Sequence, residues 1–562
     1  MREGMDSVEP KGIGSLKRVW FSRLLAAAGV ATVIAAAGLG GTCLARWMRV
    51  QPVTAVGMVE PWGKMAADLQ AWDKPDLALV LSGEQHGYIL PCGCSRPQMG
   101  GLERRQNFLR VLKSRGWPVL AVDAGDIPQK GGPVNLGNEQ GLIKYRYSMM
   151  ALKEMGYQAV GLGIYEMGLG LFKTLGEYAL NDTAPRILAA NLKDAANQYP
   201  DQTAAWQSVK DERLPCKVGI ASVVGPRVAA VNQDKTVEFT PAAEALSAVR
   251  KEMDAASITL RVLVYQGYYS KAAANEEPRE VEGVAKAFPE FQVILALSEE
   301  DEPSSQATRI RHADGHETVV VRVGHKGKHL GVLGLWLGKD GKPATSKYSL
   351  VQMSEDYLTP EGAEKENPVA LLMERYTREL ERDNYLGRHP QVNHPFQAAE
   401  PESEPRYVGS EKCQKCHGNA YKVWAASGHG HAHQTLVEAR NPGRRQFDPE
   451  CIVCHTVGYG YKGGFASLEK TPALVNVGCE SCHGPASEHM KNSSDPTWHA
   501  LMNPWKAVPG EDEKKKQSRL LKADQFCQTC HDIDNDVTWT NNGFSRKWPK
   551  VAHPTPEAEK NR

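Results

Sequence analysis

The chain lacks an excess of charge of either sign. Its 67 lysines and arginines nearly balance its 66 aspartates and glutamates, and the formal net charge is +1 over 562 residues. A protein that binds nucleic acid through a broad surface normally carries a clear positive excess. The short basic run Lys514–Lys516 is interpreted as solvated surface. We therefore expect no nucleic-acid partner.

Charge is also missing from one stretch near the N-terminus, residues 24–45, which is rich in Ala, Val, Leu and Ile. Its 22 residues are enough to cross a bilayer as a helix. Basic residues flank it on both sides: Lys11, Lys17, Arg18 and Arg23 before it, and Arg46 and Arg49 after it. The bias favours a cytoplasmic N-terminus and a chain that continues on the outer side. A cleaved signal peptide is the alternative, but the run is longer than the usual apolar region of such peptides.

Cysteine is scarce outside the last third of the chain. Eight of the twelve cysteines lie in four copies of Cys-x-x-Cys-His: Cys413-Gln-Lys-Cys416-His417, Cys451-Ile-Val-Cys454-His455, Cys479-Glu-Ser-Cys482-His483 and Cys527-Gln-Thr-Cys530-His531. This pattern is the attachment site of c-type haem, in which both thiols bond to the porphyrin and the histidine binds iron. Tetrahedral zinc sites need paired ligands without a histidine after each pair. A thioredoxin-like motif would occur once.

The motifs predict four covalently attached c-type haems, with His417, His455, His483 and His531 as proximal ligands. The sixth ligand of each iron decides its reactivity. Six further histidines are candidates in this region: His429, His431, His433, His489, His499 and His553. This supply favours several bis-histidine irons, which suit electron transfer. For His431, His433 and His499, contacts with haem propionates or with solvent are favoured over iron ligation.

The remaining sequence divides into segments of different character. Between residues 76 and 353, buried-strand runs such as Leu77–Leu81 and Leu260–Val264 alternate with helical stretches at Gly101–Arg115 and Gly141–Met155. This alternation predicts an α/β layered domain. Two later runs, Thr318–Val323 and Leu330–Leu337, are interpreted as an antiparallel pair.

Residues 354–405 predict a helix followed by a linker, and from 406 onward apolar periodicity is weak. We therefore expect a multidomain protein with an N-terminal transmembrane helix, an α/β domain and a mostly helical, loop-rich tetrahaem domain. The expected segments are 1–23 (cytoplasmic), 24–45 (anchor), 46–75 (spacer), 76–353 (α/β domain), 354–405 (helix and linker) and 406–562 (haem domain).

Two segments, Glu450–Phe465 and Val477–Pro485, resemble the tetrahaem cytochrome c-554 family. Tyr407–Cys413 and Trp424–His429 match the first-haem region of that family, so the likeness covers about residues 406–535. Members of the family shuttle electrons between periplasmic redox enzymes.

The resemblance implies roles for particular histidines. It makes His429 a distal ligand to a haem of another motif and His489 the next distal candidate. It also implies that the haem at Cys451, Cys454 and His455 has no side chain on its distal face. The family tail is longer than the residues that follow His531 here, and His553 is our choice for the remaining distal ligand.

Residues 76–350 resemble calcineurin-like metallophosphoesterases of the 5′-nucleotidase branch. The landmarks are Gly83-Glu-Gln-His-Gly87, Asp123-Ala-Gly-Asp126, Gly163-Ile-Tyr-Glu-Met167, Ala189-Ala-Asn-Leu192 and Val320–Gly331. Several positions depart from the family. Glu84 replaces an aspartate ligand and Ile164 an asparagine ligand, Gln266 and Ser298–Asp301 stand where later histidines are expected, and Tyr165 replaces the catalytic histidine. The surviving candidates are Glu84, His86, Asp126, Glu166 and Asn191. A two-metal phosphoesterase needs its full ligand set, so this activity is not expected.

Cys92 and Cys94 form a Cys-x-Cys pair in the α/β domain. A structural or disulfide role and a functional thiol role both remain open for it.

Three functions follow from these patterns. The leading one is a membrane-anchored periplasmic electron carrier that exchanges electrons with periplasmic or membrane redox proteins. The second is a haem enzyme that acts on a small nitrogen or sulfur compound at the open haem of His455. The third, a metal-dependent phosphoesterase, is disfavoured by the lost ligands.

Overall fold

The computed structural model describes most of the chain after the N-terminal segment. The described residues are 62–91, 96–132, 136–178, 184–194, 201–209, 211, 214–269, 280–298 and 300–553. The predicted anchor at 24–45 and the thiols Cys92 and Cys94 lie outside these residues. Within the described ranges, no helix combines the length and the apolar character that crossing a bilayer requires.

Two sheets form the centre of the α/β region. The first has the strand order β15-β14-β1-β2-β3-β4-β6, with β15 at Pro343–Gln352, β14 at His329–Leu337, β1 at Leu77–Ser82, β2 at Val119–Asp123, β3 at Tyr157–Gly161, β4 at Arg186–Leu188 and β6 at Thr203–Ala204. The second has the order β12-β13-β11-β10-β8-β7, with β12 at Thr308–Arg311, β13 at Glu317–Val321, β11 at Val293–Leu297, β10 at Leu260–Tyr268, β8 at Val218–Val224 and β7 at Trp206–Ser208.

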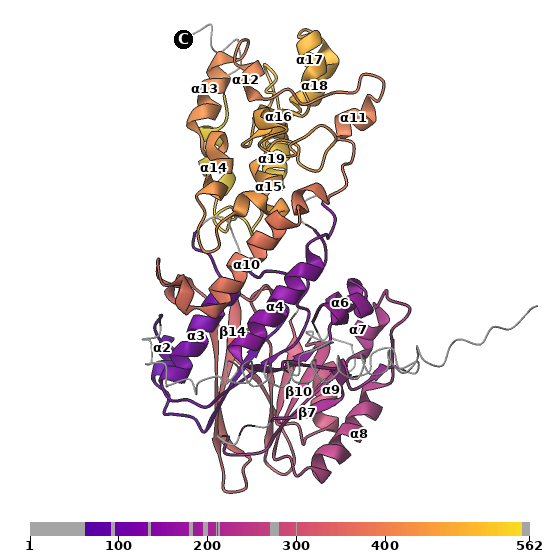
Figure 1. Ribbon diagram of the computed structural model, residues 1–562, viewed down its shortest axis with the longest axis vertical. Helices are drawn as coiled ribbons and strands as arrows, with labels where there is room; N and C mark the ends of the chain where they lie inside the picture. Colours follow the sequence, from indigo (N-terminus) through magenta and orange to yellow (C-terminus); the bar gives the residue numbers. More distant parts are fainter. Residues whose placement is uncertain are drawn as a thin grey trace, which may run out of the picture. The chain divides into compact units, whose positions relative to one another are not determined.

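Successive side chains of β10 show how the layers are built. Val262 and Val264 belong to the core that the two sheets share, whereas Leu263 belongs to the cluster beneath α8 (Ala242–Ala255) and α9 (Glu280–Ala287). Side chains alternate between the two faces of a strand, so a strand buried on both faces is apolar throughout. Figure 1 shows the sheets between α8 and α9 on one side and α3 (Leu102–Ser114) and α4 (Gly141–Met155) on the other.

The layered α/β architecture expected from the sequence is therefore present, and both predicted helices form as α3 and α4. The predicted antiparallel pair of Thr318–Val323 with Leu330–Leu337 is wrong. β13 pairs with β11 and β12 in the second sheet, whereas β14 lies between β1 and β15 in the first. Both strands are apolar on both faces, so their pattern does not specify a partner. The connection crosses between sheets and carries residues 322–328 past the ends of the strands.

Helix α10 (Pro368–Arg382) connects the α/β region to the C-terminal region. It begins at Asn367, whose side-chain oxygen accepts hydrogen bonds from the N–H groups of Val369 and Ala370 at 3.0 and 3.2 Å. The Asn367 amide nitrogen also donates to Asn107 and Thr359, and the side chain is fully buried. Further along, the Tyr376 ring packs against α4, as Figure 1 shows for the two helices.

The segment after α10 is more ordered than a linker. Pro395–Ala399 forms α11, and the preceding His394 caps it by accepting the N–H of Phe396 at 3.2 Å. A histidine ring nitrogen supplied the cap where the composition of the segment indicated only a linker.

Short helices and loops make up the C-terminal region. The helices are α12 (Ser410–Cys413), α13 (Gly418–Ala426), α14 (Ala432–Val437), α15 (Pro449–His455), α16 (Cys479–His483), α17 (Ser487–Lys491), α18 (Pro496–Met502), α19 (Glu513–Cys527) and α20 (Gly543–Lys547). Its apolar cluster of buried side chains is small: Leu436, Ile452, Val457, Tyr459, Phe465 and Leu474. So few apolar side chains form only a small core, which agrees with the weak apolar periodicity of the sequence from residue 406 onward.

Replacing Asn367 with alanine is expected to lower the free energy of unfolding by about 2–4 kcal/mol, because α10 loses its cap and the buried groups around it lose their partners. Urea unfolding followed by circular dichroism measures this change. The matched control is Asn419→Ala, since Asn419 is an exposed helical asparagine. Equal midpoints for the two variants would contradict the assigned role.

Candidate haem sites and the pocket of the α/β region

Each Cys-x-x-Cys-His motif forms a helical turn. In the second and third motifs, α15 and α16 contain all three functional residues. In the first and fourth, the N–H of His417 donates to the Cys413 carbonyl at 2.8 Å and that of His531 to the Cys527 carbonyl at 2.9 Å. Residues i, i+3 and i+4 share one face of a helix. The two sulfurs and the imidazole of each motif therefore lie on the same side, as attachment to one porphyrin requires.

Three of the four motif histidines are held through Nδ1. Nδ1 of His455 donates to the Ala432 carbonyl at 2.6 Å, and that of His483 donates to the Met502 carbonyl at 2.6 Å. Nδ1 of His531 contacts the Asp536 carboxylate at 3.0 Å. A partner at Nδ1 fixes the tautomer and leaves Nε2 available for a metal. Burial also lowers the pKa of His455 and His483, which keeps both imidazoles neutral.

Three motif histidines each face a second histidine. The ring centres of His417 and His489, of His429 and His531, and of His483 and His553 are all 6.1 Å apart. Metal–imidazole bonds of about 2 Å on either side of one ion place the ring centres about 6 Å apart. All three separations fit one iron between the two rings, so the residues present suit haem.

The fourth motif histidine, His455, differs from these. Among the ring contacts of the described residues, none includes His455. His433 is buried near it and leaves its Nε2 without a hydrogen bond. His499 is not paired with a motif histidine, because its Nε2 contacts the Ser493 carbonyl at 2.8 Å. His431 is exposed.

Sulfur contacts show which motifs are neighbours. The side chains of Cys413 and Cys479 lie close together, which brings the first and third motifs side by side. Cys454 and Cys530 lie close together in the same way and join the second and fourth motifs. Cys482 of the third motif lies within electrostatic range of the thiols of the fourth. The four motifs are therefore neighbours in space in the order first, third, fourth, second.

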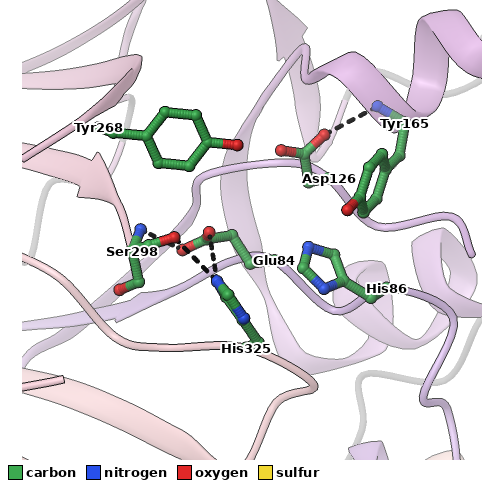
Figure 2. A pocket seen from close by; sticks show the side chains of 7 residues that line it. All are labelled: Glu84, His86, Asp126, Tyr165, Tyr268, Ser298 and His325. Carbon is green, nitrogen blue, oxygen red and sulfur yellow. Dashed lines mark hydrogen bonds and ion pairs between the residues drawn. The ribbon is translucent and has the colours of Figure 1, made fainter. Parts of the chain in front are cut away.

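A second site, of about 290 Å³, lies in the α/β region. Seven residues line it: Glu84, His86, Asp126, Tyr165, Tyr268, Ser298 and His325. Figure 2 shows these side chains around a common space. Most follow the carboxyl ends of parallel strands, where α/β folds place their ligand sites. Glu84, His86 and Asp126 have φ values of 50°, 50° and 52°. Left-handed backbone at non-glycine residues is strained and typical of functional sites.

Two of the pocket residues, Glu84 and His325, form an ion pair with each other. The Glu84 carboxylate lies 3.2 Å from Nε2 of His325 and accepts the N–H of Ser298 at 2.8 Å. Nδ1 of His325 contacts Asp301 at 2.9 Å. Burial lowers the pKa of His325, but the bonds and charges of Glu84 and Asp301 outweigh it and raise that pKa to about 9. For Glu84 burial dominates and raises the pKa to about 7. A histidine cation thus sits against the carboxylate that was a candidate metal ligand.

Of the other candidate metal ligands, His86 and Asp126 line the pocket, whereas Glu166 and Asn191 bond to backbone groups. His86 faces the pocket, and burial lowers its pKa to about 3, so it is neutral. Asp126 also faces the pocket but accepts the backbone N–H of Tyr165 at 2.9 Å. Glu166 accepts three backbone N–H groups, and Asn191 holds β8 through Val224. In the described part of the chain, no cluster of three His, Cys, Asp or Glu side chains is placed to hold a metal ion.

His325 and Tyr268 are pocket residues that the sequence did not predict. The late ligands were expected at Ser298–Asp301, because the segment containing His325 resembles a hairpin. The feature that could have indicated His325 is its place directly after a glycine in the loop that follows β13. That glycine, Gly324, has a φ of 75°. A polar residue in a tight loop at a strand end is a candidate for a functional site.

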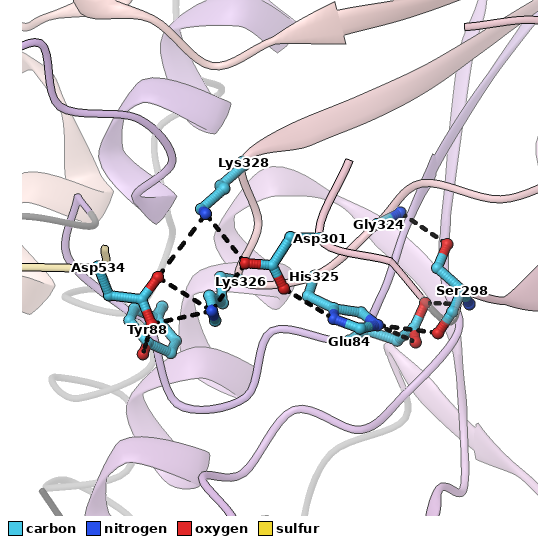
Figure 3. Close-up of polar contacts among 9 residues, drawn as sticks. All are labelled: Glu84, Tyr88, Ser298, Asp301, Gly324, His325, Lys326, Lys328 and Asp534. Atoms are coloured by element: carbon cyan, nitrogen blue, oxygen red, sulfur yellow. Dashed lines mark hydrogen bonds and ion pairs between the residues drawn. The ribbon is translucent and has the colours of Figure 1, made fainter. Parts of the chain in front are cut away.

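The pocket is linked to the fourth motif by ion pairs, which Figure 3 shows. Asp301 binds Lys326 and Lys328 at 2.8 and 3.1 Å. The same lysines lie 2.9 and 3.7 Å from Asp534, in the turn that follows His531. A second link joins Lys144 of α4 to Glu450, beside the second motif.

Comparison with known proteins separates the two regions. The family model "Cytochrome c554 and c-prime" matches residues 412–484. Cytochrome c-554 of Nitrosomonas europaea is 29% identical over 136 residues, which cover 22% of this chain and 57% of that protein. The C-terminal region resembles cytochrome c-554. The resemblance seen in the sequence is confirmed, and it implies covalently bound haem. The match spans little more than half the length of that relative.

Solved structures are similar to the α/β region. The 5′-nucleotidase precursor of Thermus thermophilus is 19% identical with a TM-score of 0.43, and the match covers 54% of this chain and 59% of that one. A calcineurin-like phosphoesterase of Bacillus subtilis is 17% identical with a TM-score of 0.41, covering 54% of this chain and 97% of that one. A likeness at this level concerns the fold alone, and no activity follows from it.

The His325 ion pair predicts how stability depends on pH. Its folded pKa of about 9 exceeds the unfolded value of about 6.5, so its contribution is fully present below pH 6.5 and is lost as pH rises through 9. Between pH 6 and pH 9.5 the free energy of unfolding should fall by about 1–3 kcal/mol from this group.

Urea unfolding at the two pH values measures that difference. His325→Gln should reduce it, whereas replacing the exposed His431 with Gln should leave it unchanged. An undiminished pH difference in His325→Gln would show that the ion pair does not stabilise the fold.

Proposed function

We propose that this protein is a membrane-anchored, multihaem c-type cytochrome that carries electrons through four covalently bound haems. The three histidine pairs at 6.1 Å are the observation that carries the proposal. Two imidazole ligands keep the coordination of an iron constant between its oxidation states, which suits electron transfer. When bound, the haems supply one-electron redox chemistry.

The protein supplies the arrangement of these sites. Sulfur contacts place the first, third, fourth and second motifs in one contiguous order. The hydrogen bonds at Nδ1 of His455, His483 and His531 hold each imidazole in one orientation. Fixed ligands and short gaps between neighbouring sites are what electron transfer along a protein requires. This supports a carrier with several sites in series.

For location and partners, we propose a single N-terminal anchor with the bulk of the chain on the periplasmic side, where it exchanges electrons with periplasmic or membrane redox proteins. The uncharged run at 24–45 and its basic flanks support the anchor, and covalent haem attachment supports the compartment. Carbonate extraction of membranes tests this. An anchored chain stays in the membrane, whereas a processed chain is released without residues 24–45.

A second candidate function is ligand chemistry at the haem of the second motif. The absence of a ring contact to His455 in the described residues favours it. An iron with one protein ligand can bind a small nitrogen or sulfur compound. For the phosphoesterase alternative the residues present do not fit, since Ile164 cannot replace an amide ligand, Tyr165 cannot replace the catalytic histidine, and Glu84 is bonded to His325.

Electron paramagnetic resonance of the oxidised, haem-loaded protein is expected to show three low-spin irons and one high-spin iron. Replacing His429, His489 or His553 with alanine should each convert about one third of the low-spin signal to high spin, because one iron loses its second imidazole. The control His499→Ala should leave the spectrum unchanged. If none of the three substitutions alters the low-spin signal, the proposed ligand pairs are wrong.

The second candidate is tested by adding nitric oxide or hydroxylamine to the same protein. We expect the high-spin signal alone to change, since the other irons have both axial positions filled. A protein without any high-spin iron would exclude this function and leave the carrier function intact.

A further inference from the structure

The turn after the fourth motif has two faces with different partners. Within it, the Asp532 carboxylate accepts the N–H groups of Asp534 and Asn535 at 3.0 and 2.7 Å. Asp536 is buried and contacts Nδ1 of His531 at 3.0 Å. The Asp536 carboxylate that orients the His531 imidazole is also bound by Lys547 and by the Thr538 hydroxyl, so the turn helps to determine where it lies.

Asp534, on the other face of the turn, is held by the α/β region. Its carboxylate lies 2.9 Å from the Lys326 ammonium and 3.7 Å from that of Lys328, and it accepts the Tyr88 hydroxyl at 3.0 Å (Figure 3). Only 17% of the Asp534 side chain is exposed. Three groups from two loops of the α/β region thus converge on one carboxylate of the C-terminal region.

Both lysines are also held by contacts within the α/β region. The side chains of Lys326 and Lys328 are 16% and 7% exposed, and both bind Asp301. The N–H of Lys326 donates to the Glu84 carbonyl at 2.7 Å, and the Lys328 carbonyl accepts the N–H of Met353 at 2.8 Å. Buried ammonium groups need carboxylate partners. Asp534 is therefore bound by a rigid pair of cations rather than by mobile surface chains.

The contacts of Asp534 with Lys326 and Lys328 are connected through the turn to His531, the expected iron ligand. A carboxylate at Nδ1 increases the electron donation of an imidazole to its metal and stabilises the oxidised ion. Releasing the turn would weaken the contact between Asp536 and His531. The contact from Asp534 to the lysines is the support that the α/β region gives to this arrangement.

We propose that the α/β region sets the reduction potential of the haem held at Cys527, Cys530 and His531, with Lys326, Lys328 and Asp534 as positioning residues. The inference rests on the proposed function, since it requires a bis-histidine haem at the fourth motif. It gives the phosphoesterase-like fold a role that needs no metal ion: its pocket loops hold the environment of a haem.

The test is a redox titration of the haem-loaded, full-length protein followed by electron paramagnetic resonance. The low-spin signal that disappears in His429→Ala identifies the fourth-motif haem, because His429 faces His531. We expect Asp534→Asn to raise the midpoint of this signal alone. The variant Lys326→Gln/Lys328→Gln should raise the same midpoint, and combining all three substitutions should give less than the sum of the two shifts.

The sign of the midpoint shift in Lys326→Gln/Lys328→Gln distinguishes a positioning role of the lysines from a direct effect of their charge on the haem. Removing two positive charges by itself would lower the midpoint, whereas loss of Asp534 would raise it. Shifts of opposite sign, or no shift, would overturn the proposal. Arg444→Gln is the control, since it breaks the ion pair of Arg444 with Glu381 away from this turn and should leave all midpoints unchanged.

Failure of this inference can be told apart from failure of the proposed function. If no low-spin signal depends on His429, the ligand assignment fails. If such a signal exists and keeps its midpoint in Asp534→Asn, only the role of the α/β region fails. Retention of the low-spin signal in the Asp534, Lys326 and Lys328 variants shows that the haem site has remained folded.

Discussion

The charge pairing at Asp301 is the interaction on which the arrangement of the α/β pocket and its neighbouring loops depends. One carboxylate binds His325 through one oxygen and Lys326 and Lys328 through the other. Three cations so close together repel one another unless carboxylates lie between them. Glu84 on one side and Asp534 on the other complete the balance. The pocket, the crossing loop and the turn after the fourth motif are therefore parts of one network.

This network explains why a fold similar to metallophosphoesterases has a pocket without an assembled metal cluster in its described residues. Glu84 is longer than the aspartate expected there by one methylene group and reaches the His325 cation. The strained backbone at Glu84, His86 and Asp126 is retained although two of these side chains now bond to protein groups. Strain of this kind persists only where the surrounding structure enforces it. Here the loop that contains Lys326 bonds to the backbone of Glu84 and also contacts Asp534 of the C-terminal region.

How much was predictable varies from residue to residue. Spacing alone predicts the haem cysteines and the proximal histidines, and periodicity predicts the helices that form as α3 and α4. His429, His489 and His553 could be named as candidates, but sequence does not state that His489 faces His417 or that His553 faces His483. The partners of β13 and β14 were wrongly predicted, and His325 was missed with them. Strands that are apolar on both faces carry no information about which neighbour they choose.

The sequence by itself determined the chemistry of each local unit: where haem can attach, which helices form, and which metal ligands are lost. Those properties depend on residues a few positions apart, and a helical turn or a short motif encodes them completely. Tertiary structure alone decided which histidines face each other, that His455 has no ring partner in the described region, and that Asp534 meets Lys326 and Lys328. These contacts join residues tens to hundreds of positions apart. They arise from how the layers and loops pack, and no local pattern records that.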